Sequence, residues 1–411
     1  MTIGSGWASL LKENVPAAFT SKCPRKPTVC FIDGQIKLNK SEHIHTWRQF
    51  LDICFINPIE YYFANGTMRV VLAFDNYELV PKSKGMTQTK RNKQTVNFTF
   101  GNRDALPKTP PPEWNACMRN RVFKTKVINM IVANLKRHFS DLSDTTLVLD
   151  YMQVEVLGRA WHVADALDGC NKNGESDCKA YDYAEQNVPL LIDSIDGDML
   201  VLSMLHIKNN PSTDIMIRRI LTKTAEERKR KRSSRAREYE FVSVPHLVNF
   251  IQTNLKLQPD PVTGFATMTA LCGCDFTRNL PRLGESSLWK SRHNIKDCDL
   301  SRVDGILLAL ALFYLETFQK SVNFGNLLKA NAEKTGKERY DEVWQKIQST
   351  QKINPKIRDS IWSVTVAECH CRNVLWTLRY WEDRDGAPFP MVPEFGFGFG
   401  KKQTPQFLCE L

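Results

Sequence analysis

The chain lacks any apolar run long enough to cross a bilayer, which takes about 20 consecutive apolar residues. Its first residues also lack the charged and then apolar pattern of a secretory signal peptide. The 12 cysteines are scattered along 411 residues, and without a secretory signal we interpret them as reduced thiols. No internal repeat is visible. These absences argue against a membrane or secreted protein and predict an intracellular one.

The composition is that of a globular protein. Hydrophobic residues make up 42% of the chain and charged residues 25%, which argues against disorder. The length allows two domains, or one large domain with additions. The formal net charge is +11 and the pI is 9.0. This balance favours a polyanionic partner, nucleic acid above all.

Apolar segments that end in an acid alternate with helical patterns in the first part of the chain. Residues 28–33 (TVCFID) and 68–75 (MRVVLAFD) are rich in β-formers, and residues 45–56 between them have the apolar spacing of a helix. Two strands joined by a helix are typical of βαβ units and a parallel sheet. The sequence therefore predicts an α/β fold with a mostly parallel central sheet flanked by helices.

Further elements are expected along the rest of the chain. A long amphipathic helix is expected over 112–138, with Trp114, Val122, Val127, Ile131 and Leu135 on or near one face. A turn and a short helix are expected over 174–188. The other expectations are strands over 145–152, 214–222 and 238–244 and helices over 245–257, 265–275, 303–319 and 357–380.

The stretch 190–205, LLIDSIDGDMLVLSML, is an apolar run interrupted by acids. Asp193, Asp196 and Asp198 lie where a buried strand gives way to a turn. A strand that delivers carboxylates at its carboxyl end is a common way to build a metal site on an open α/β sheet.

Acids of this kind recur at the ends of apolar segments or in tight turns. They are Asp33, Asp75, Glu175, Asp177, Asp196, Asp198 and Asp275. In a parallel sheet they would share one edge, where their charges repel unless divalent cations neutralise them. Mg²⁺ takes oxygen ligands and keeps several waters, and Mn²⁺ is expected to substitute for it. Two such ions roughly 3.5–4 Å apart suit phosphodiester hydrolysis, because both stabilise the attacking and leaving oxygens.

Each acid also has a simpler interpretation. A single Asp after a strand is most often a helix cap or a turn residue. Asp193 is interpreted in this way as a structural residue, and Asp150 as a surface or turn acid. The seven acids together are more specific than any one of them, because order, spacing and segment type agree.

Several short segments carry a resemblance to a known family. They are GSGWASLLKEN, CFIDG, LAFDN, GESD, SIDGDML and LCGCDFTRNLPRLG. In this order they resemble the opening segment, the two strands with the first catalytic aspartates, the Glu-x-Glu pair, the Asp-x-Asp-x-Leu element and the Leu-x-Gly-x-Asp-Tyr segment of the flap endonuclease family. That family comprises structure-specific 5′ nucleases of the PIN-like nuclease superfamily. The resemblance covers about residues 1–290.

The resemblance implies an organisation and a site. It implies a PIN-like nuclease domain over 1–275, a helix–hairpin–helix-like and C-terminal helical region over 276–385, and a flexible tail over 386–411. The seven acids would hold two Mg²⁺ ions, the first mainly on the side of Asp75 and Glu175, the second on the side of Asp196, Asp198 and Asp275. Asp198 is counted among the catalytic residues as well.

The family also has a helical arch over its site, which the resemblance places at about 80–138. Lys82 lies at about the interval of the family's catalytic Lys, and Arg91 or Lys90 approximates its partner Arg. A cation there would stabilise charge on the transferred phosphate. The alternative is a solvated basic loop in which Lys84, Lys90 and Lys93 contact nucleic-acid phosphates without specificity.

The chain departs from the family in its hairpin and its C-terminus. The family's hairpin carries Gly-x-Gly, whose amides approach a DNA phosphate beside a K⁺ ion, and Arg282 replaces one of these glycines. Arg282 is expected to contact phosphate itself. No sliding-clamp motif is recognised near the C-terminus. The run RKRKRSSRAR over 228–237 is interpreted as a nuclear-localisation signal, a nucleic-acid patch or a solvated loop.

The resemblance implies a monomeric, nuclear, Mg²⁺-dependent nuclease of DNA replication and repair that acts on flapped, branched or nicked DNA. The pattern GESDCK also resembles the 5′→3′ exoribonucleases of the wider superfamily. One alternative is therefore a 5′→3′ exonuclease on single-stranded RNA or DNA. Another alternative, from a different class, is a catalytically silent nucleic-acid-binding scaffold.

Overall fold

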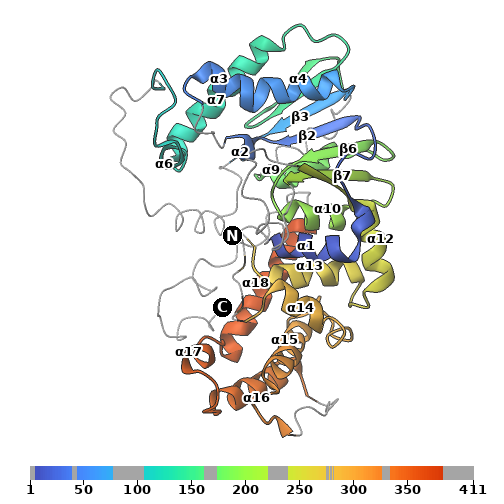
Figure 1. Ribbon diagram of the computed structural model, residues 1–411, viewed down its shortest axis with the longest axis vertical. Coiled ribbons are helices and arrows are strands. Elements are labelled where there is room, and N and C mark those ends of the chain that lie inside the picture. Colours follow the sequence, from blue (N-terminus) through green and yellow to red (C-terminus); the bar gives the residue numbers. More distant parts are fainter. Residues whose placement is uncertain are drawn as a thin grey trace, which may run out of the picture.

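A computed structural model describes residues 5–38, 44–76, 106–161, 174–220, 239–274, 277, 280, 282–325 and 334–382. Its centre is an eight-stranded sheet in the order β1-β8-β7-β6-β2-β3-β4-β5 (Figure 1). Within these ranges no helix has the length and apolar character needed to span a membrane. The strands are β1 (Phe19–Thr20), β2 (Val29–Asp33), β3 (Arg69–Ala73), β4 (Thr146–Asp150), β5 (Val154–Gly158), β6 (Pro189–Asp193), β7 (Asp214–Ile220) and β8 (Tyr239–Ser243).

The five central strands run parallel. β2 pairs with β3 on one side and β6 on the other, β4 extends the sheet beyond β3, and β7 extends it beyond β6. The outer strands β5, β8 and β1 pair antiparallel. The prediction of an α/β fold with a mostly parallel sheet is thus confirmed. Its PIN-like identity stays a prediction.

Helices cover both faces of the sheet, because alternate strand residues point to opposite sides. Cys30 and Ile32 of β2 join a core cluster with the helices α3 (Trp47–Leu51), α4 (Asn57–Ala64) and α7 (Arg121–His138). Val29 and Phe31 join another cluster, which includes α1 (Ser5–Asn14), α10 (Asp198–Asn209), α12 (Val244–Asn254) and α13 (Pro261–Leu271). Figure 1 shows the two helical layers above and below the strands.

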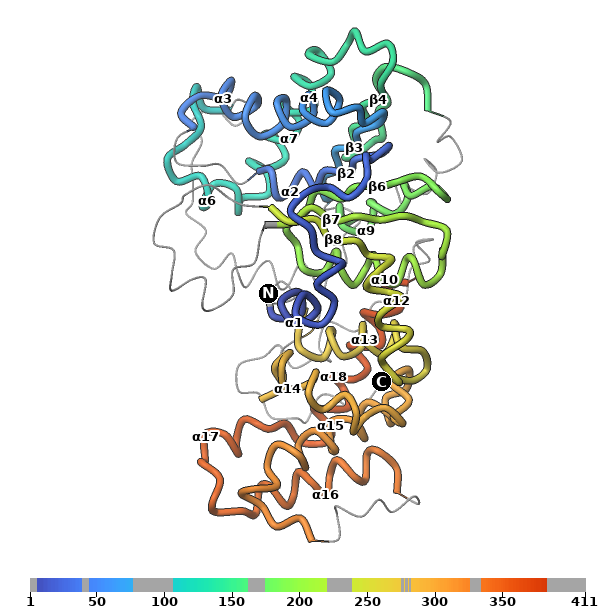
Figure 2. The backbone as a smooth tube through the Cα atoms, turned by 45° about the vertical axis from the view of Figure 1, so that its right-hand side comes forward, coloured from blue at the N-terminus to red at the C-terminus, as the bar shows by residue number. Residues whose placement is uncertain are grey.

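The C-terminal helices form a further tier beyond α13 (Figure 2). They are α14 (Glu285–Ser291), α15 (Val303–Phe318), α16 (Gly336–Gln348), α17 (Pro355–Arg358) and α18 (Val364–Glu382). One core cluster includes Trp7 of α1, Phe265 of α13 and Trp381 of α18. Among the described residues, apolar packing is therefore continuous past the domain boundary expected at 275. The helix–hairpin–helix identity of this region stays a prediction.

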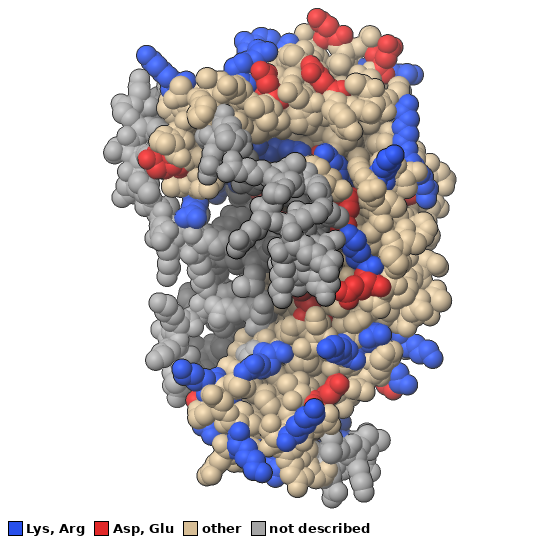
Figure 3. Space-filling view, in the orientation of Figure 1, with Lys and Arg blue, Asp and Glu red and all other residues tan. Residues whose placement is uncertain are grey.

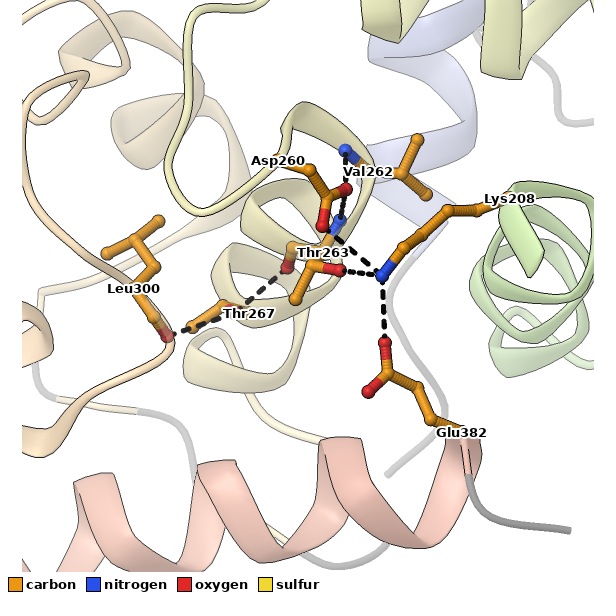
Figure 4. Close-up of polar contacts among 7 residues, drawn as sticks. All are labelled: Lys208, Asp260, Val262, Thr263, Thr267, Leu300 and Glu382. Atoms are coloured by element: carbon orange, nitrogen blue, oxygen red, sulfur yellow. Dashed lines mark hydrogen bonds and ion pairs between the residues drawn. The ribbon is translucent and has the colours of Figure 1, made fainter.

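A polar contact joins three of these helices (Figure 4). The Lys208 ammonium at the end of α10 donates to the Thr263 hydroxyl at 2.6 Å. It also lies 3.2 Å from both the Asp260 and the Glu382 carboxylates. Asp260 caps α13 through its bonds from the amides of Val262 and Thr263, so the contact ties the layer under the sheet to the last helix.

Three expectations about helices and strands were wrong. The helix expected over 112–138 is two helices, α6 (Trp114–Cys117) and α7, because the Asn120 side chain accepts from the Phe123 amide and begins a new helix. Val122, expected on the buried face, is 65% exposed. The helix expected over 357–380 is broken between α17 and α18, where the Ser360 amide donates to the Ile357 carbonyl in a tight turn. Strands β1 and β5 were not expected.

Candidate metal centre

Asp33 lies at the carboxyl end of β2, on the face of the sheet against which α10 and α13 pack. Its Oδ1 accepts from the Gln35 amide at 2.9 Å and so caps the short helix α2 (Gly34–Lys37). Gly34 is required there, since a Cβ atom would lie 2.6 Å from the Ala73 carbonyl oxygen and from the Phe74 ring. The close approach of β2 and β3 at this glycine brings Asp75, which follows β3, near Asp33.

Asp75 follows β3 and is joined to the segment that holds Glu175 and Asp177. The Asn76 amide donates to the Gly174 carbonyl at 2.7 Å, and the Ser176 amide donates to Asp75 Oδ1 at 3.0 Å. The Ser176 hydroxyl donates to Asp33 Oδ1 at 3.1 Å. Ser176 therefore binds both aspartates and places its neighbours beside them.

Glu175 and Asp177 flank Ser176 at the start of α9 (Ser176–Lys179). Glu175 is buried and Asp177 is half-buried. Because Ser176 is bonded to Asp33 and Asp75, the two acids that flank it are brought to the same edge of the sheet. The chain thus joins the two strand ends to the GESD segment.

Asp196 and Asp198 reach the same edge through the turn after β6. The Ser194 hydroxyl lies 3.3 Å from Asp33 Oδ2 and accepts from the Asp196 amide at 3.1 Å. Asp196 Oδ1 in turn accepts from the Asp198 amide at 3.0 Å. Asp198 is the first residue of α10, where the helix dipole favours a carboxylate.

The charges of this cluster act on one another. Burial raises the pKa of Asp33 to about 7, and the negative charges of Asp75 and Asp196 contribute to this rise. In the part of the chain that the structure describes, no lysine or arginine forms an ion pair with Asp33 or Asp75. The cluster therefore concentrates negative charge at a buried position.

Two other strand-end aspartates have the opposite environment. Asp193, at the end of β6, accepts through Oδ2 from Lys37 at 2.9 Å, Tyr62 at 3.0 Å and Arg218 at 3.2 Å. It points to the opposite face from Asp33, because the preceding Ile192 packs with Phe31 while Asp193 alternates to the other side. The interpretation of Asp193 as a structural residue is consistent with these contacts.

Asp150, at the end of β4, was expected to be a surface or turn acid, and this was wrong. It is fully buried. Its Oδ1 accepts from Lys179 at 2.6 Å and its Oδ2 from Tyr183 at 2.8 Å. Lys179 also donates to the Phe74 carbonyl at 3.0 Å. This buried ion pair holds α9 against the strand that leads to Asp75.

The remaining predicted site residues are placed differently. Arg282 is exposed and has φ +65°, a left-handed conformation that glycine adopts without strain. Its replacement of a family glycine and its expected contact with phosphate both stay predictions. Lys82, Lys84, Lys90, Arg91, Lys93 and Asp275 lie outside the described residues.

Sequence reasoning missed three residues that build the site. Ser176 and Ser194 orient Asp33, and Lys179 supports α9. Ser176 lies within GESD and Ser194 is the first residue of SIDGD, so proximity to the acids was their only signal. Lys179 is the Lys of GESDCK, but nothing in that pattern indicates a buried partner in a strand 29 residues earlier.

The donor chemistry fits a hard divalent cation. All the candidate ligands that come together are carboxylates, and their mutual repulsion would be relieved by positive charge. The described residues hold no group of three acidic, histidine or cysteine side chains already spaced to bind a metal ion. Comparison with family models and with curated proteins found no match to this chain.

Proposed function

We propose that the protein is a Mg²⁺-dependent nuclease that hydrolyses phosphodiester bonds in flapped, branched or nicked DNA. One observation carries the proposal: acids from three separated segments meet around Asp33, and the described residues offer Asp33 and Asp75 no basic partner. The buried acids Asp150 and Asp193 of the same sheet have lysine or arginine partners. A cluster that keeps its repulsion is suited to binding cations.

Two groups of acids, one on each side of Asp33, would each hold one ion. Asp75, Glu175 and Asp177 would hold one ion, and Asp196 and Asp198, with Asp275, the other. Bound Mg²⁺ would activate water and stabilise charge on the transferred phosphate. Ser176 and Ser194 fix the orientation of Asp33 between the two sides. The buried Lys179–Asp150 pair keeps α9 at its distance from β3.

Charge supports nucleic acid as the substrate. The formal net charge of +11 favours association with a polyanion although the proposed site itself is acidic. Cations near the site are then needed to hold the phosphate backbone. We propose Lys82 and Arg91 for charge stabilisation, and Lys84, Lys90, Lys93 and Arg282 for backbone contacts. Nuclear localisation and a monomeric state belong to the same proposal.

A cleavage panel tests this function. Labelled 5′-flap DNA, nicked duplex and single-stranded RNA would each be incubated with Mg²⁺, Mn²⁺ or EDTA. We expect cleavage of the flapped and nicked DNA with either metal and none in EDTA. Degradation of single-stranded RNA alone would favour the exonuclease alternative, and binding without cleavage of any substrate would favour the silent scaffold.

A variant of one acid ties the activity to the site. Asp198→Ala should abolish cleavage while leaving DNA binding nearly intact. Asp141→Ala is the matched control, because Asp141 is exposed and precedes the amino end of β4, whereas the acids lie at the carboxyl ends of the parallel strands. Cleavage by Asp198→Ala at the rate of the control would show that the assignment of the metal ligands is wrong.

A further inference from the structure

A second site lies in the helical tier, away from the carboxylates. A cavity of about 330 Å³ opens between the end of α12 and the segment after α14. The buried side chains of Leu255 and Leu257 contribute to its lining. The polar lining includes Lys256, Arg292, His293 and Lys296. Two segments separated by more than 30 residues thus bring their basic side chains to one opening.

The charge of this basic pocket is of one sign. No acidic side chain lines it. Within the described ranges, no carboxylate forms an ion pair with Lys256, Arg292 or Lys296. Elsewhere on the described surface basic side chains are commonly paired, as Lys12 is with Glu240 and Lys136 with Glu155. The pocket therefore presents positive charge that no described acid neutralises.

Arg292 is held in place for binding. Its Nη1 donates to the Trp289 carbonyl at 2.6 Å, and its guanidinium carbon lies 4.4 Å from the centre of the Trp289 ring. Trp289 is itself buried in the core. A guanidinium fixed in this way loses less conformational freedom when it binds an anion.

Basic side chains are also frequent on one face of the helical tier. In the space-filling view, Lys and Arg side chains gather across the lower, helical half of the molecule at the height of α14, with few acids among them (Figure 3). Guanidinium and ammonium groups both bind phosphate in proteins. A row of such groups suits a ligand with repeated phosphates.

We propose that this basic pocket binds backbone phosphates of the nucleic acid, remote from the bond that is cleaved. The inference rests on the proposed function in taking nucleic acid as the partner. Contacts of this kind position a duplex without reading its sequence. The pocket would therefore anchor one arm of the substrate while the carboxylate cluster meets another part of it.

The test compares two double variants that lose the same charge. Lys256→Ala/Lys296→Ala removes two exposed lysines of the pocket. Lys346→Ala/Lys352→Ala removes two exposed lysines of α16 and the turn that follows it. Binding of labelled duplex DNA would be followed by fluorescence anisotropy in EDTA, so that no hydrolysis occurs, over a series of salt concentrations.

The pocket variant should weaken binding at least about tenfold and reduce the slope of log K against log salt by about 2, since each phosphate contact contributes about 0.9. The control variant should change both quantities much less. Equal effects of the two variants would overturn the proposal. Circular dichroism would verify that both variants are folded.

A second arm separates nucleic acid from free phosphate. Inorganic phosphate, at ionic strength matched with chloride, should compete with DNA for the wild type and not for the pocket variant. Phosphate that raises the wild-type melting temperature, with DNA affinity unchanged in the pocket variant, would assign the site to free phosphate and overturn the proposal.

The two proposals fail in different ways. If the pocket variant cleaves flapped DNA and binds DNA as tightly as the control variant, only the proposal for the pocket is refuted. Pocket-dependent binding without cleavage under any metal condition refutes the nuclease alone. A wild-type protein that binds no nucleic acid refutes both.

Discussion

At the scale of residues, two aspartates on adjacent strands have opposite environments. Asp33 and Asp193 end the paired strands β2 and β6, yet Asp193 has Lys37 and Arg218 as partners while Asp33 is bonded by serine hydroxyls. The alternation of strand side chains explains the difference, because the two residues face opposite sides of the sheet. Position at a strand end therefore does not by itself make an acid a ligand.

Removing one charge from the cluster should stabilise the metal-free protein. Asp75→Asn keeps the Oδ1 acceptor for the Ser176 amide and removes the repulsion with Asp33. We expect the free energy of unfolding in EDTA to rise by roughly 1 kcal/mol, the equivalent of about one pKa unit. Stabilisation by added Mg²⁺ should fall at the same time. Chemical denaturation with and without Mg²⁺ measures both changes in the free energy of unfolding. If Mg²⁺ stabilised the variant as much as the wild type, the assignment of Asp75 as a metal ligand would be contradicted.

The Lys179–Asp150 pair should behave as a buried ion pair. Lys179→Met leaves the Asp150 carboxylate buried without its cation and should cost about 3–5 kcal/mol in the free energy of unfolding. The double variant Lys179→Met/Asp150→Asn should recover much of this loss, because it leaves no unpaired charge. Urea denaturation of the wild type, Lys179→Met, Asp150→Asn and the double variant gives the coupling energy. A loss below about 1 kcal/mol for Lys179→Met would refute this description.

The sequence predicted most of the acids that meet at the site but not what holds them. An acid that follows an apolar segment can be recognised from the sequence alone. Such acids are expected to meet because the strand ends of a parallel sheet share an edge. The partners of Asp150 and Asp193 come from segments distant in the chain, and a single sequence carries no signal for such pairs. The difference between a neutralised acid and a cluster that keeps its repulsion therefore emerged only from the fold.

At the scale of elements, the helix α7 shows where periodicity was insufficient. Its buried side chains are Phe123, Val127, Ile128, Ile131 and Leu135. The prediction of one helix from residue 112 missed the new helix that Asn120 caps. It therefore placed Val122 on the wrong face. Strand β5 was missed because it is a partly exposed edge strand without a strong apolar alternation. The buried parallel strands, by contrast, were all expected within a few residues.

Two valines of α7, Val122 and Val127, provide a direct test of its orientation. Val127→Ala should cost about 1–2 kcal/mol in the free energy of unfolding, because its side chain is fully buried against the sheet. Val122→Ala should have an effect within about 0.5 kcal/mol, since Val122 is 65% exposed. Chemical denaturation of the two variants would decide the matter. The reverse order of the two effects would show that α7 packs through the other face.

At the scale of the whole molecule, the contact around Lys208 links the layers. Burial acts to raise the pKa of Asp260, but hydrogen bonds from Thr263 and the positive charge of Lys208 outweigh it and hold that pKa below its ordinary value. A carboxyl group with a lowered folded-state pKa stabilises the protein above its unfolded pKa and loses this contribution as the pH falls. The three-helix contact should therefore weaken in acid.

The variant Asp260→Asn isolates this charge, because asparagine still caps α13. We expect it to cost up to about 1 kcal/mol near pH 7, a modest value because Lys208 and Asp260 are partly exposed. The difference from the wild type should shrink as the pH falls below about 4, where the aspartate of the unfolded chain is protonated. Urea denaturation between neutral and acidic pH measures the difference, and one independent of pH would refute the role of the charge.

The continuity of the core predicts that the chain cannot be divided at 275. A fragment ending there would expose the surfaces of α10 and α13 that pack against α18. We expect it to bind a hydrophobic dye and to unfold without a sharp thermal transition, whereas the full chain should show one. A fragment with a cooperative transition close to that of the full chain would establish an independent domain.

The strand order also sets when the carboxylate cluster can exist during synthesis. β2 pairs with β3, which is close in the chain, but its other neighbour β6 begins at Pro189. A nascent chain that has emerged only as far as Asp75 holds two of the acids and has an unpaired edge on β2. At elongation rates of about 5–20 residues per second, Asp198 follows on the order of ten seconds later. The acids up to Asp198 can therefore gather only when about half of the chain has been made, and a shorter nascent chain has no complete cluster.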